Sequence, residues 1–191
     1  MKPPSPSQKK RNKPAVIRHA SLQKKLRRIK LFLCDVDGVL TNGSVFMSGR
    51  DEMKQFHIQD GLGLRLLQQN GIKIGWISNR PSSVTLQRAT ELKVDFLSQD
   101  KSSKVETVTQ LLARTKLTWE DVSFMGDDVV DLGVLRRAGV ALVPANGIAE
   151  ARDLADYVTK KAGGDGAVRE VVEMILKAQN KWTRLIEEYS A

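Results

Sequence analysis

Short apolar runs alternate along the chain with longer segments whose apolar residues recur at helical spacing, for example GLGLRLLQQN (61–70) and SKVETVTQLLART (103–115). The predicted strands are LFLC (31–34), IKIGWIS (72–78), VDFL (94–97), DVSFM (121–125), GVALV (139–143) and DYVT (156–159). Such alternation is typical of a parallel sheet with helices on both faces. The pattern therefore predicts an α/β fold of the Rossmann-like type.

Two segments depart from this alternation. SVFMSGRDEMKQFHI (44–58) predicts a small β-hairpin that turns at residues 48–51, directly after the first strand. Near the C-terminus, KAGGDGA (161–167) predicts a glycine-rich loop. Residues 167–189 then predict one long helix, so the glycine-rich tail and helix together span 163–189.

Charge divides the chain into an arm and a body. The net charge is +9, but residues 1–30 hold 11 Lys and Arg with no Asp or Glu, and the other 161 residues carry 20 basic and 22 acidic side chains. The stretch MKPPSPSQKKRNKP has almost no apolar residues, so we expect residues 1–20 to be a basic disordered arm and residues 21–191 to form one domain.

Composition also indicates the compartment. No apolar segment follows the charges of the arm, as a secretory signal would require, and we find no run long enough to cross a membrane. A single cysteine, Cys34, within an apolar run suits a reducing environment. We therefore expect a cytoplasmic protein.

Two carboxylates end the first predicted strand. In a strand, residues i and i+2 point to the same side, so Asp35 and Asp37 share a side if the strand geometry continues to Asp37. Open α/β sheets bind ligands at the carboxyl ends of their strands, and Gly38 allows a sharp turn there. Carboxylates this close require a cation or a shared proton. Mg²⁺ is the natural candidate because it prefers oxygen ligands and is commonly shared with a phosphate.

Four motifs occur in the order found in the haloacid dehalogenase (HAD) superfamily of phosphotransferases. DVDGVLTNG (35–43) resembles the first motif of that superfamily, and Ser78 ends the second strand where it has a phosphate-binding Ser or Thr. Lys104 opens a helix at the place of the superfamily lysine, and GDDVVD (126–131) resembles its acidic metal motif. Four motifs in order are far more specific than one.

The resemblance extends to one family of small-capped phosphatases, which act on 3-deoxy-D-manno-octulosonate 8-phosphate in lipopolysaccharide synthesis. KQFHIQDGLG, ISNRPS, MGDDVVDL and GGDGAVRE carry it, and it covers about Leu22 to Tyr189. It implies a β-hairpin flap instead of a cap domain, a homotetramer, and a glycine-rich tail that closes over a neighbouring active site. The alternative is a phosphatase for another nine-carbon ulosonic acid phosphate or a small sugar phosphate.

The resemblance implies a mechanism for the acidic residues. Asp35 would attack phosphorus and form an aspartyl-phosphate, and Asp37 would protonate the leaving oxygen and then activate water. Mg²⁺ would be held by Asp35, the backbone carbonyl of Asp37, and Asp127. Asp128 and Asp131 would act around the metal. Mn²⁺ in place of Mg²⁺ is left open.

Ser78 and Lys104 are the remaining catalytic candidates. Ser78 would hydrogen-bond a phosphoryl oxygen, and Lys104 would offset the developing negative charge. The alternative for Ser78 is a turn residue that ends the strand. Lys101, three residues before Lys104, competes with it for the role of the phosphate-stabilising lysine.

The candidates for substrate binding are Asp60, Asn79, Arg80 and Arg169. Asp60 could instead cap the helix that follows it, and Arg80 could bind a neighbouring carboxylate. Arg169 would either reach an adjacent subunit's site or form an ion pair on the helix surface. His57 is interpreted as structural.

Two positions depart from the family pattern. The family usually has Thr-Asp-Gly where this chain has Thr41-Asn42-Gly43, and Thr-Gly-Arg where it has Ser78-Asn79-Arg80. Neither change removes a predicted acid, nucleophile or metal ligand, but Asn79 adds a side chain beside the predicted phosphate site. These changes bear on specificity more than on chemistry.

A different class of function would use the basic arm. Eleven basic residues could bind nucleic acid phosphates weakly and in a salt-dependent manner. The arm interleaves no aromatic residues for base stacking, so we interpret it as a solubilising or weakly tethering appendage. A phosphatase fold without activity is disfavoured by the complete set of acidic residues.

Overall fold

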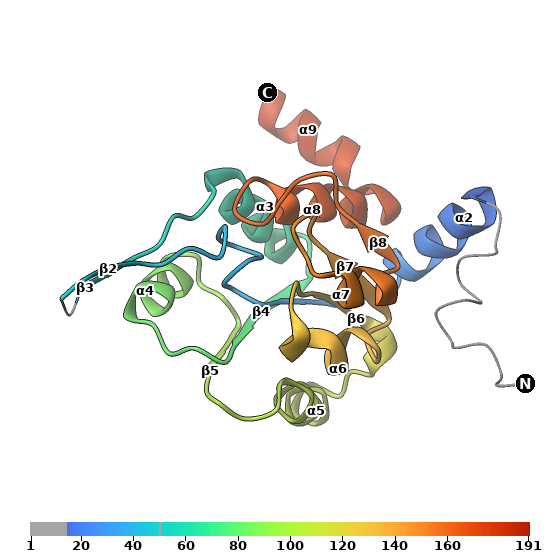
Figure 1. Ribbon diagram of the computed structural model, residues 1–191. Helices are drawn as coiled ribbons and strands as arrows, with labels where there is room; N and C mark the ends of the chain where they lie inside the picture. Colours follow the sequence, from blue (N-terminus) through green and yellow to red (C-terminus); the bar gives the residue numbers. More distant parts are fainter. Residues whose placement is uncertain (1–14, 50) are drawn as a thin grey trace, which may run out of the picture.

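A computed structural model describes residues 15–49 and 51–191. Its centre is a parallel sheet in the order β5-β4-β1-β6-β7-β8, drawn in Figure 1. The strands are β1 (Leu31–Cys34), β4 (Lys73–Ser78), β5 (Phe96–Gln99), β6 (Val122–Met125), β7 (Val140–Val143) and β8 (Tyr157–Val158). The predicted parallel α/β architecture is confirmed, with strand ends shifted by one or two residues.

Strand β1 lies between β4 and β6, where the strand order changes direction. All four residues of β1 are buried, which explains why LFLC is continuously apolar rather than alternating. Successive side chains point to opposite faces, so Phe32 and Cys34 join one core while Leu31 and Leu33 join the other. The loops after β1 and β6 therefore meet at a topological switch point, the usual place for a ligand in such sheets.

Helices cover both faces of the sheet (Figure 1). One core includes side chains of α3 (Ile58–Gln69) and α8 (Ala167–Ala178), with α2 (Ala15–Leu26) at one end. The other core includes α5 (Lys104–Thr115), α6 (Leu132–Leu135) and α7 (Ala149–Leu154). The remaining helical elements are α4 (Ser83–Glu91), α9 (Trp182–Ser190) and the 3₁₀ turns η1 (Trp119–Asp121) and η2 (Val129–Asp131).

The predicted hairpin is present as β2 (Phe46–Ser48) and β3 (Asp51–Met53), an antiparallel pair that projects from the sheet (Figure 1). Phe46 pairs with Met53 across the hairpin. No larger inserted domain separates β1 from α3 in the described part of this segment, residues 35–49 and 51–57.

The prediction of one helix over 167–189 is wrong, because the chain forms α8 and α9 with a break between them. Asn180 adopts a left-handed backbone conformation, with φ of 57°. Its N–H donates to the Lys177 carbonyl and the Lys181 N–H donates to the Leu176 carbonyl, which closes the end of α8. Asn tolerates this conformation better than most residues, so the apolar periodicity continues although the helix does not.

The N-terminal boundary also differs from the prediction. Helix α2 begins at Ala15, inside the segment 1–20 that was expected to be disordered. Residues 1–14, most of the predicted arm, lie outside the described residues. Within the described chain, no helix is both long enough and apolar enough to cross a membrane.

Candidate active site

Three carboxylates converge at the carboxyl ends of β1 and β6. Asp35 follows β1 and donates its backbone N–H to the Met125 carbonyl, which extends the sheet ladder by one residue. Asp127 lies in the loop after β6, and Asp131 ends η2. Each of the three acids offers an oxygen within 4.8 Å of the others. The sequence prediction that the first and last acidic motifs meet is thus realised in space.

Lys104, in the first turn of α5, enters this cluster. Its Nζ lies 2.8 Å from Oδ1 of Asp35 and 2.7 Å from Oδ1 of Asp131, and only 3% of the residue is exposed. Burial alone would lower the pKa of Lys104, but the two carboxylates outweigh it and raise the pKa. Lys101 is exposed, so of the two lysines it is Lys104 that lies among the acids.

The electrostatics of the cluster favour a cation. Burial, reinforced by the charges of Asp35 and Asp131, raises the pKa of Asp127 to about 7. Burial also raises the pKa of Asp35 to about 6, although Lys104 opposes this. Oδ1 of Asp127 is buried and has no hydrogen-bond partner among the residues that the structure describes. A buried, unpartnered carboxylate oxygen beside a second carboxylate fits a hard divalent cation.

Backbone geometry keeps room for Asp127. Gly38 has φ of 94°, and a Cβ there would lie 2.1 Å from Oδ2 of Asp127. Any other residue at this position would therefore combine backbone strain with a collision. The glycine of the Asp-x-Asp-Gly sequence is explained by both effects.

The other two acids of GDDVVD shape the loop. Oδ2 of Asp131 accepts from the N–H groups of Asp127 at 3.0 Å and Asp128 at 3.3 Å. Asp128 is exposed, and its Oδ1 accepts from the Val129 N–H at 2.6 Å, which caps η2. Asp131 thus orients both Lys104 and the loop that carries Asp127.

Ser78 and Asn79 follow β4 at the same edge of the sheet. Oγ of Ser78 is buried and exchanges hydrogen bonds with the backbone of Arg80, at 3.1 and 3.3 Å. Nδ2 of Asn79 donates to the carbonyls of Asp100 and Ser102, at 2.9 and 2.8 Å. The Asn79 side chain therefore holds the loop that leads into α5 and Lys104.

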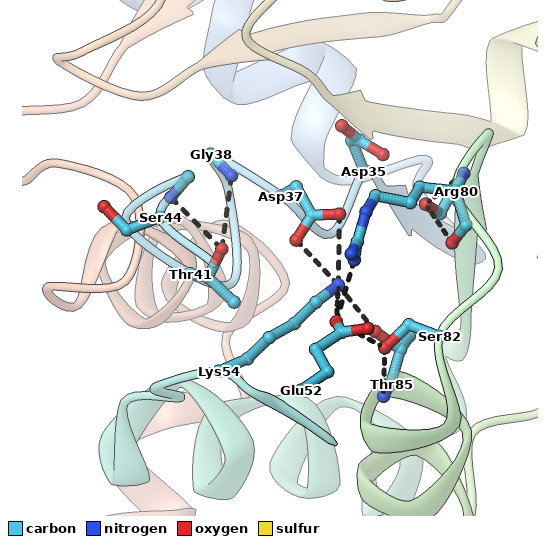
Figure 2. Close-up of polar contacts among 12 residues, drawn as sticks. Asp35, Asp37, Gly38, Thr41, Ser44, Glu52, Lys54, Arg80, Ser82 and Thr85 are labelled. Atoms are coloured by element: carbon cyan, nitrogen blue, oxygen red, sulfur yellow. Dashed lines mark hydrogen bonds and ion pairs between the residues drawn. The ribbon is translucent and has the colours of Figure 1, made fainter. Parts of the chain in front are cut away.

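Asp37 lies against the hairpin rather than against the other acids. Its Oδ1 is 2.7 Å and its Oδ2 3.1 Å from Nζ of Lys54, which follows β3 and whose side chain is fully buried (Figure 2). Lys54 was not among the predicted site residues, because a lysine between Met53 and Gln55 next to a hairpin has no signature that distinguishes it from a surface lysine. This contact joins the hairpin to the loop that follows β1.

Arg80 also contacts the hairpin. Its Nη1 lies 2.7 Å from Oε1 of Glu52, on β3, so Arg80 takes the neighbouring-carboxylate alternative (Figure 2). This hydrogen bond raises the pKa of Arg80 and, with Ser82 and the nearby cations, lowers that of Glu52.

Asp60 and Arg169 contact each other. Asp60 is 1% exposed, and its Oδ1 accepts from the Arg169 N–H at 2.7 Å. The alternative that Asp60 caps the helix that follows it is wrong, because α3 begins after His57 and already contains Asp60. The carboxylate instead caps α8, a helix distant in the sequence. The Arg169 side chain pairs with Glu173 at 3.0 Å and lies over the Trp182 ring, which is the helix-surface alternative within this chain.

Comparisons with known proteins show which family the chain resembles. Residues 78–171 match the family model described as haloacid dehalogenase-like hydrolase. The 3-deoxy-D-manno-octulosonate 8-phosphate phosphatase KdsC of Escherichia coli (strain B / BL21-DE3) is 35% identical over 163 residues, which cover 85% of this chain and 87% of that protein. The Yersinia pestis KdsC is 37% identical over 154 residues, 80% of this chain and 82% of its own.

Solved structures show the same likeness, and a crystal structure of the Moraxella catarrhalis phosphatase contains a magnesium ion, a phosphate ion and a KDO molecule. It matches with a TM-score of 0.86 and 38% identity, over 88% of this chain and 97% of that one. A cobalt-bound form of the Haemophilus influenzae phosphatase matches with a TM-score of 0.80 and 34% identity, over 82% of this chain and 92% of that one. By sequence and by structure, the chain belongs to the 3-deoxy-D-manno-octulosonate 8-phosphate phosphatase family of haloacid dehalogenase-like hydrolases.

Proposed function

We propose that this protein is a Mg²⁺-dependent phosphomonoesterase that hydrolyses 3-deoxy-D-manno-octulosonate 8-phosphate to KDO and phosphate, a step of lipopolysaccharide precursor synthesis. The observation that carries the proposal is the buried cluster of Asp35, Asp127, Asp131 and Lys104 at the switch point of the sheet. The curated relatives of 35–37% identity act on the same ester, which supports this substrate.

The first chemical step uses Asp35 and Asp37. A carboxylate oxygen of Asp35 bonds to phosphorus as the bond from phosphorus to the sugar oxygen breaks, and Asp37, which enters this step as the carboxylic acid, gives that oxygen its proton. In the second step Asp37 takes a proton from water, which attacks phosphorus and releases phosphate and free Asp35. Asp37 is suited to both steps because its side chain is 22% exposed beside a buried nucleophile.

Lys104 and Ser78 support the phosphoryl group in this proposal. Lys104 already lies 2.8 Å from the nucleophilic carboxylate, so its positive charge faces the place where negative charge develops. The Ser78 hydroxyl, buried at the end of β4, is a hydrogen-bond donor at the same edge of the sheet. Lys104 is positioned before substrate binds, which avoids reorganisation during the reaction, whereas the Ser78 hydroxyl would turn from the Arg80 carbonyl to a phosphoryl oxygen.

Asp35 and Asp127 are the side chains that would hold Mg²⁺, with the Asp37 carbonyl as a further ligand implied by the family resemblance. When bound, the ion neutralises negative charge between the nucleophile and the phosphoryl oxygens. Asp131 keeps Asp127 in place through the Asp127 N–H.

The proposed function is tested by phosphate release from purified protein with Mg²⁺, on octulosonate 8-phosphate and on a panel of sugar phosphates and other ulosonic acid phosphates. We expect kcat/KM for the octulosonate ester to exceed the others by at least about tenfold, and activity to disappear with EDTA. A preference for another ester would contradict the substrate. The absence of hydrolysis with any ester would contradict the activity.

Mg²⁺ is expected to raise the temperature of thermal unfolding, because it binds the folded acid cluster and not the unfolded chain. At 100 times the dissociation constant the gain is about 2.7 kcal/mol, roughly 5–10 °C for a domain of this size. Differential scanning fluorimetry with Mg²⁺ or EDTA measures it. Asp127→Asn should lose most of the shift, whereas Asp128→Asn, a change on an exposed helix cap, should keep it. Equal shifts in the two variants would contradict Asp127 as a ligand.

Gly163→Ala is expected to lower both stability and activity. A Cβ at Gly163 would lie 1.9 Å from the Gly38 carbonyl oxygen, so the glycine-rich loop would have to separate from the loop that follows β1. We expect a loss of roughly 1–3 kcal/mol and a fall in kcat. Gly71→Ala is the control, since its left-handed φ of 80° is strained but nothing lies within 4 Å. Gly71→Ala should destabilise the protein and leave kcat unchanged; an unchanged kcat in both would contradict the coupling of the loops.

We further propose that the hairpin packs against other copies in a homotetramer. Phe46 and Met53, which pair across the hairpin, are 58% and 65% exposed, and Met47 is 64% exposed. Apolar groups gathered on a projecting element are typical of an interface. Light scattering should give a tetramer for the native chain and smaller species for Phe46→Ser/Met53→Ser. A monomeric native protein would contradict the proposal.

We also propose that the protein is cytoplasmic and that its basic arm is a solubilising or weakly tethering appendage. A reducing cytoplasm suits the buried free thiol of Cys34. Nucleic acid binding through the basic arm is the less favoured alternative, and salt-dependent RNA binding that disappears on deletion of residues 1–20 would support it.

A further inference from the structure

Lys54 is a buried cation whose contacts all lie beside the active site. Its side chain has 0% exposure. Nζ contacts both carboxylate oxygens of Asp37, at 2.7 and 3.1 Å, and donates to Oγ1 of Thr85 at 3.1 Å (Figure 2). A buried ammonium is costly unless it is paired and hydrogen-bonded, so the fold places this group against these partners and not in solvent.

A second carboxylate, that of Glu52, lies on the other side of the same ammonium. Its Oε1 is 3.5 Å from Nζ of Lys54, and it accepts from Arg80 at 2.7 Å and from Oγ of Ser82 at 2.9 Å (Figure 2). The charges of these two carboxylates, of Lys54 and of Arg80 sum to zero. Lys54 is the cation in contact with both carboxylates, and without it Asp37 would lose its charge partner on the hairpin.

The contacts connect three segments of the chain. Lys54 follows strand β3 of the hairpin, Asp37 lies in the loop after β1, and Thr85 lies in the first turn of α4. Since both oxygens of Asp37 contact one ammonium, the plane and position of the carboxylate are set by the hairpin. Part of the Asp37 side chain, 22%, still faces solvent, where a substrate oxygen can reach it.

We propose that Lys54 is the positioning residue for Asp37 and that the hairpin thereby takes part in proton transfer. The inference rests on the function proposed above, in which Asp37 protonates the leaving oxygen. Lys54 does not touch the reacting atoms; it holds the Asp37 carboxyl group at the distance and angle from which the protonated form gives a proton and the ionised form takes one. General acid catalysis is worth about 10² to 10⁴ in rate and depends on this geometry.

The nature of the leaving group separates a positioning role from a merely structural one. A sugar alkoxide needs a proton to leave, whereas p-nitrophenolate is a stable anion that leaves without one. Loss of Asp37 positioning should therefore slow the release of KDO much more than the release of p-nitrophenolate. A general loss of folded protein would reduce both in the same proportion.

The experiment compares single-turnover rates of leaving-group release by the full-length protein with Mg²⁺, on octulosonate 8-phosphate and on p-nitrophenyl phosphate. For Lys54→Met we expect KDO release to fall about 10- to 100-fold and p-nitrophenolate release to fall less than about threefold. Lys73→Met, on an exposed lysine of β4, is the control and should change neither rate. The ratio of the two rates within one preparation does not depend on how much of the variant is folded.

Each outcome decides between the two proposals. The ratio of interest is the rate of KDO release divided by the rate of p-nitrophenolate release. If the native protein is active and this ratio is the same in Lys54→Met as in the native protein, the role of Lys54 is overturned and the proposed function stays intact. A fall of at least about threefold in this ratio would support the role of Lys54, and any smaller fall would overturn it. A native protein that releases neither leaving group would overturn the proposed function and the inference with it.

Discussion

Replacing Asp35 with asparagine is expected to abolish phosphate release while leaving the fold intact. The amide has nearly the same shape but cannot attack phosphorus, and loss of a covalent nucleophile costs at least about 10⁴ in kcat. The control is Asp51→Asn, which removes an exposed carboxylate of the hairpin and should leave kcat within about twofold of the native value. Steady-state phosphate release with Mg²⁺ measures both, and residual turnover of more than about 1% in Asp35→Asn would contradict the role of nucleophile.

The same substitution is expected to stabilise the protein without metal at alkaline pH. Burial raises the pKa of Asp35 to about 6, so the folded chain holds a proton that the unfolded chain has released. The proton bound to folded Asp35 stabilises the protein below about pH 6. This stabilisation is lost as the pH rises through that value, because the native carboxylate must then ionise inside the fold. Asp35→Asn avoids this cost, on the order of 1–3 kcal/mol. In EDTA, the variant should unfold at a higher temperature than the native protein at pH 8, and the difference should shrink at pH 5.

The parts of the fold that follow from local pattern were predictable. The six strands and the hairpin depend on apolar periodicity and on turn residues, which are local properties of the sequence. The motifs were identified by their resemblance to a known family. The break at Asn180 was not predictable from periodicity, because the apolar stripe of α8 resumes in α9 and only a backbone angle changes.

The candidate site was predictable to the extent that residues followed strands. Asp35 comes directly after β1 and Asp127 comes two residues after the end of β6, so adjacency of these strands brings the two acids together. Lys54 and Asp60 act through tertiary contacts with segments distant in sequence, to Asp37 in one case and to the start of α8 in the other. Nothing near them in the sequence marks such partners, so structure was needed to find their roles.

Lys104→Met is expected to have the largest effect on stability. The ammonium contacts two buried carboxylates, and a third, that of Asp127, lies close to them. Removing the cation leaves the acids to repel one another in a buried site, which typically costs about 3–5 kcal/mol. The midpoint temperature of thermal unfolding, measured in EDTA at pH 8, should fall by roughly 6–20 °C for a domain of this size. Mg²⁺ should recover part of the loss, since it supplies the missing positive charge.

Activity should not recover to the same extent as stability. A metal can balance the acids, but it cannot also supply the positive charge that Lys104 places 2.8 Å from the attacking carboxylate, so kcat with saturating Mg²⁺ should remain about 10²- to 10³-fold below the native value. Lys101→Met is the matched control: it removes an exposed lysine three residues away, so we expect a change within about 0.5 kcal/mol and no loss of kcat. A larger loss of kcat in Lys101→Met than in Lys104→Met would reverse the assignment. The two residues are the same chemically and nearly the same in sequence position, so a difference between the variants would come from burial among the acids.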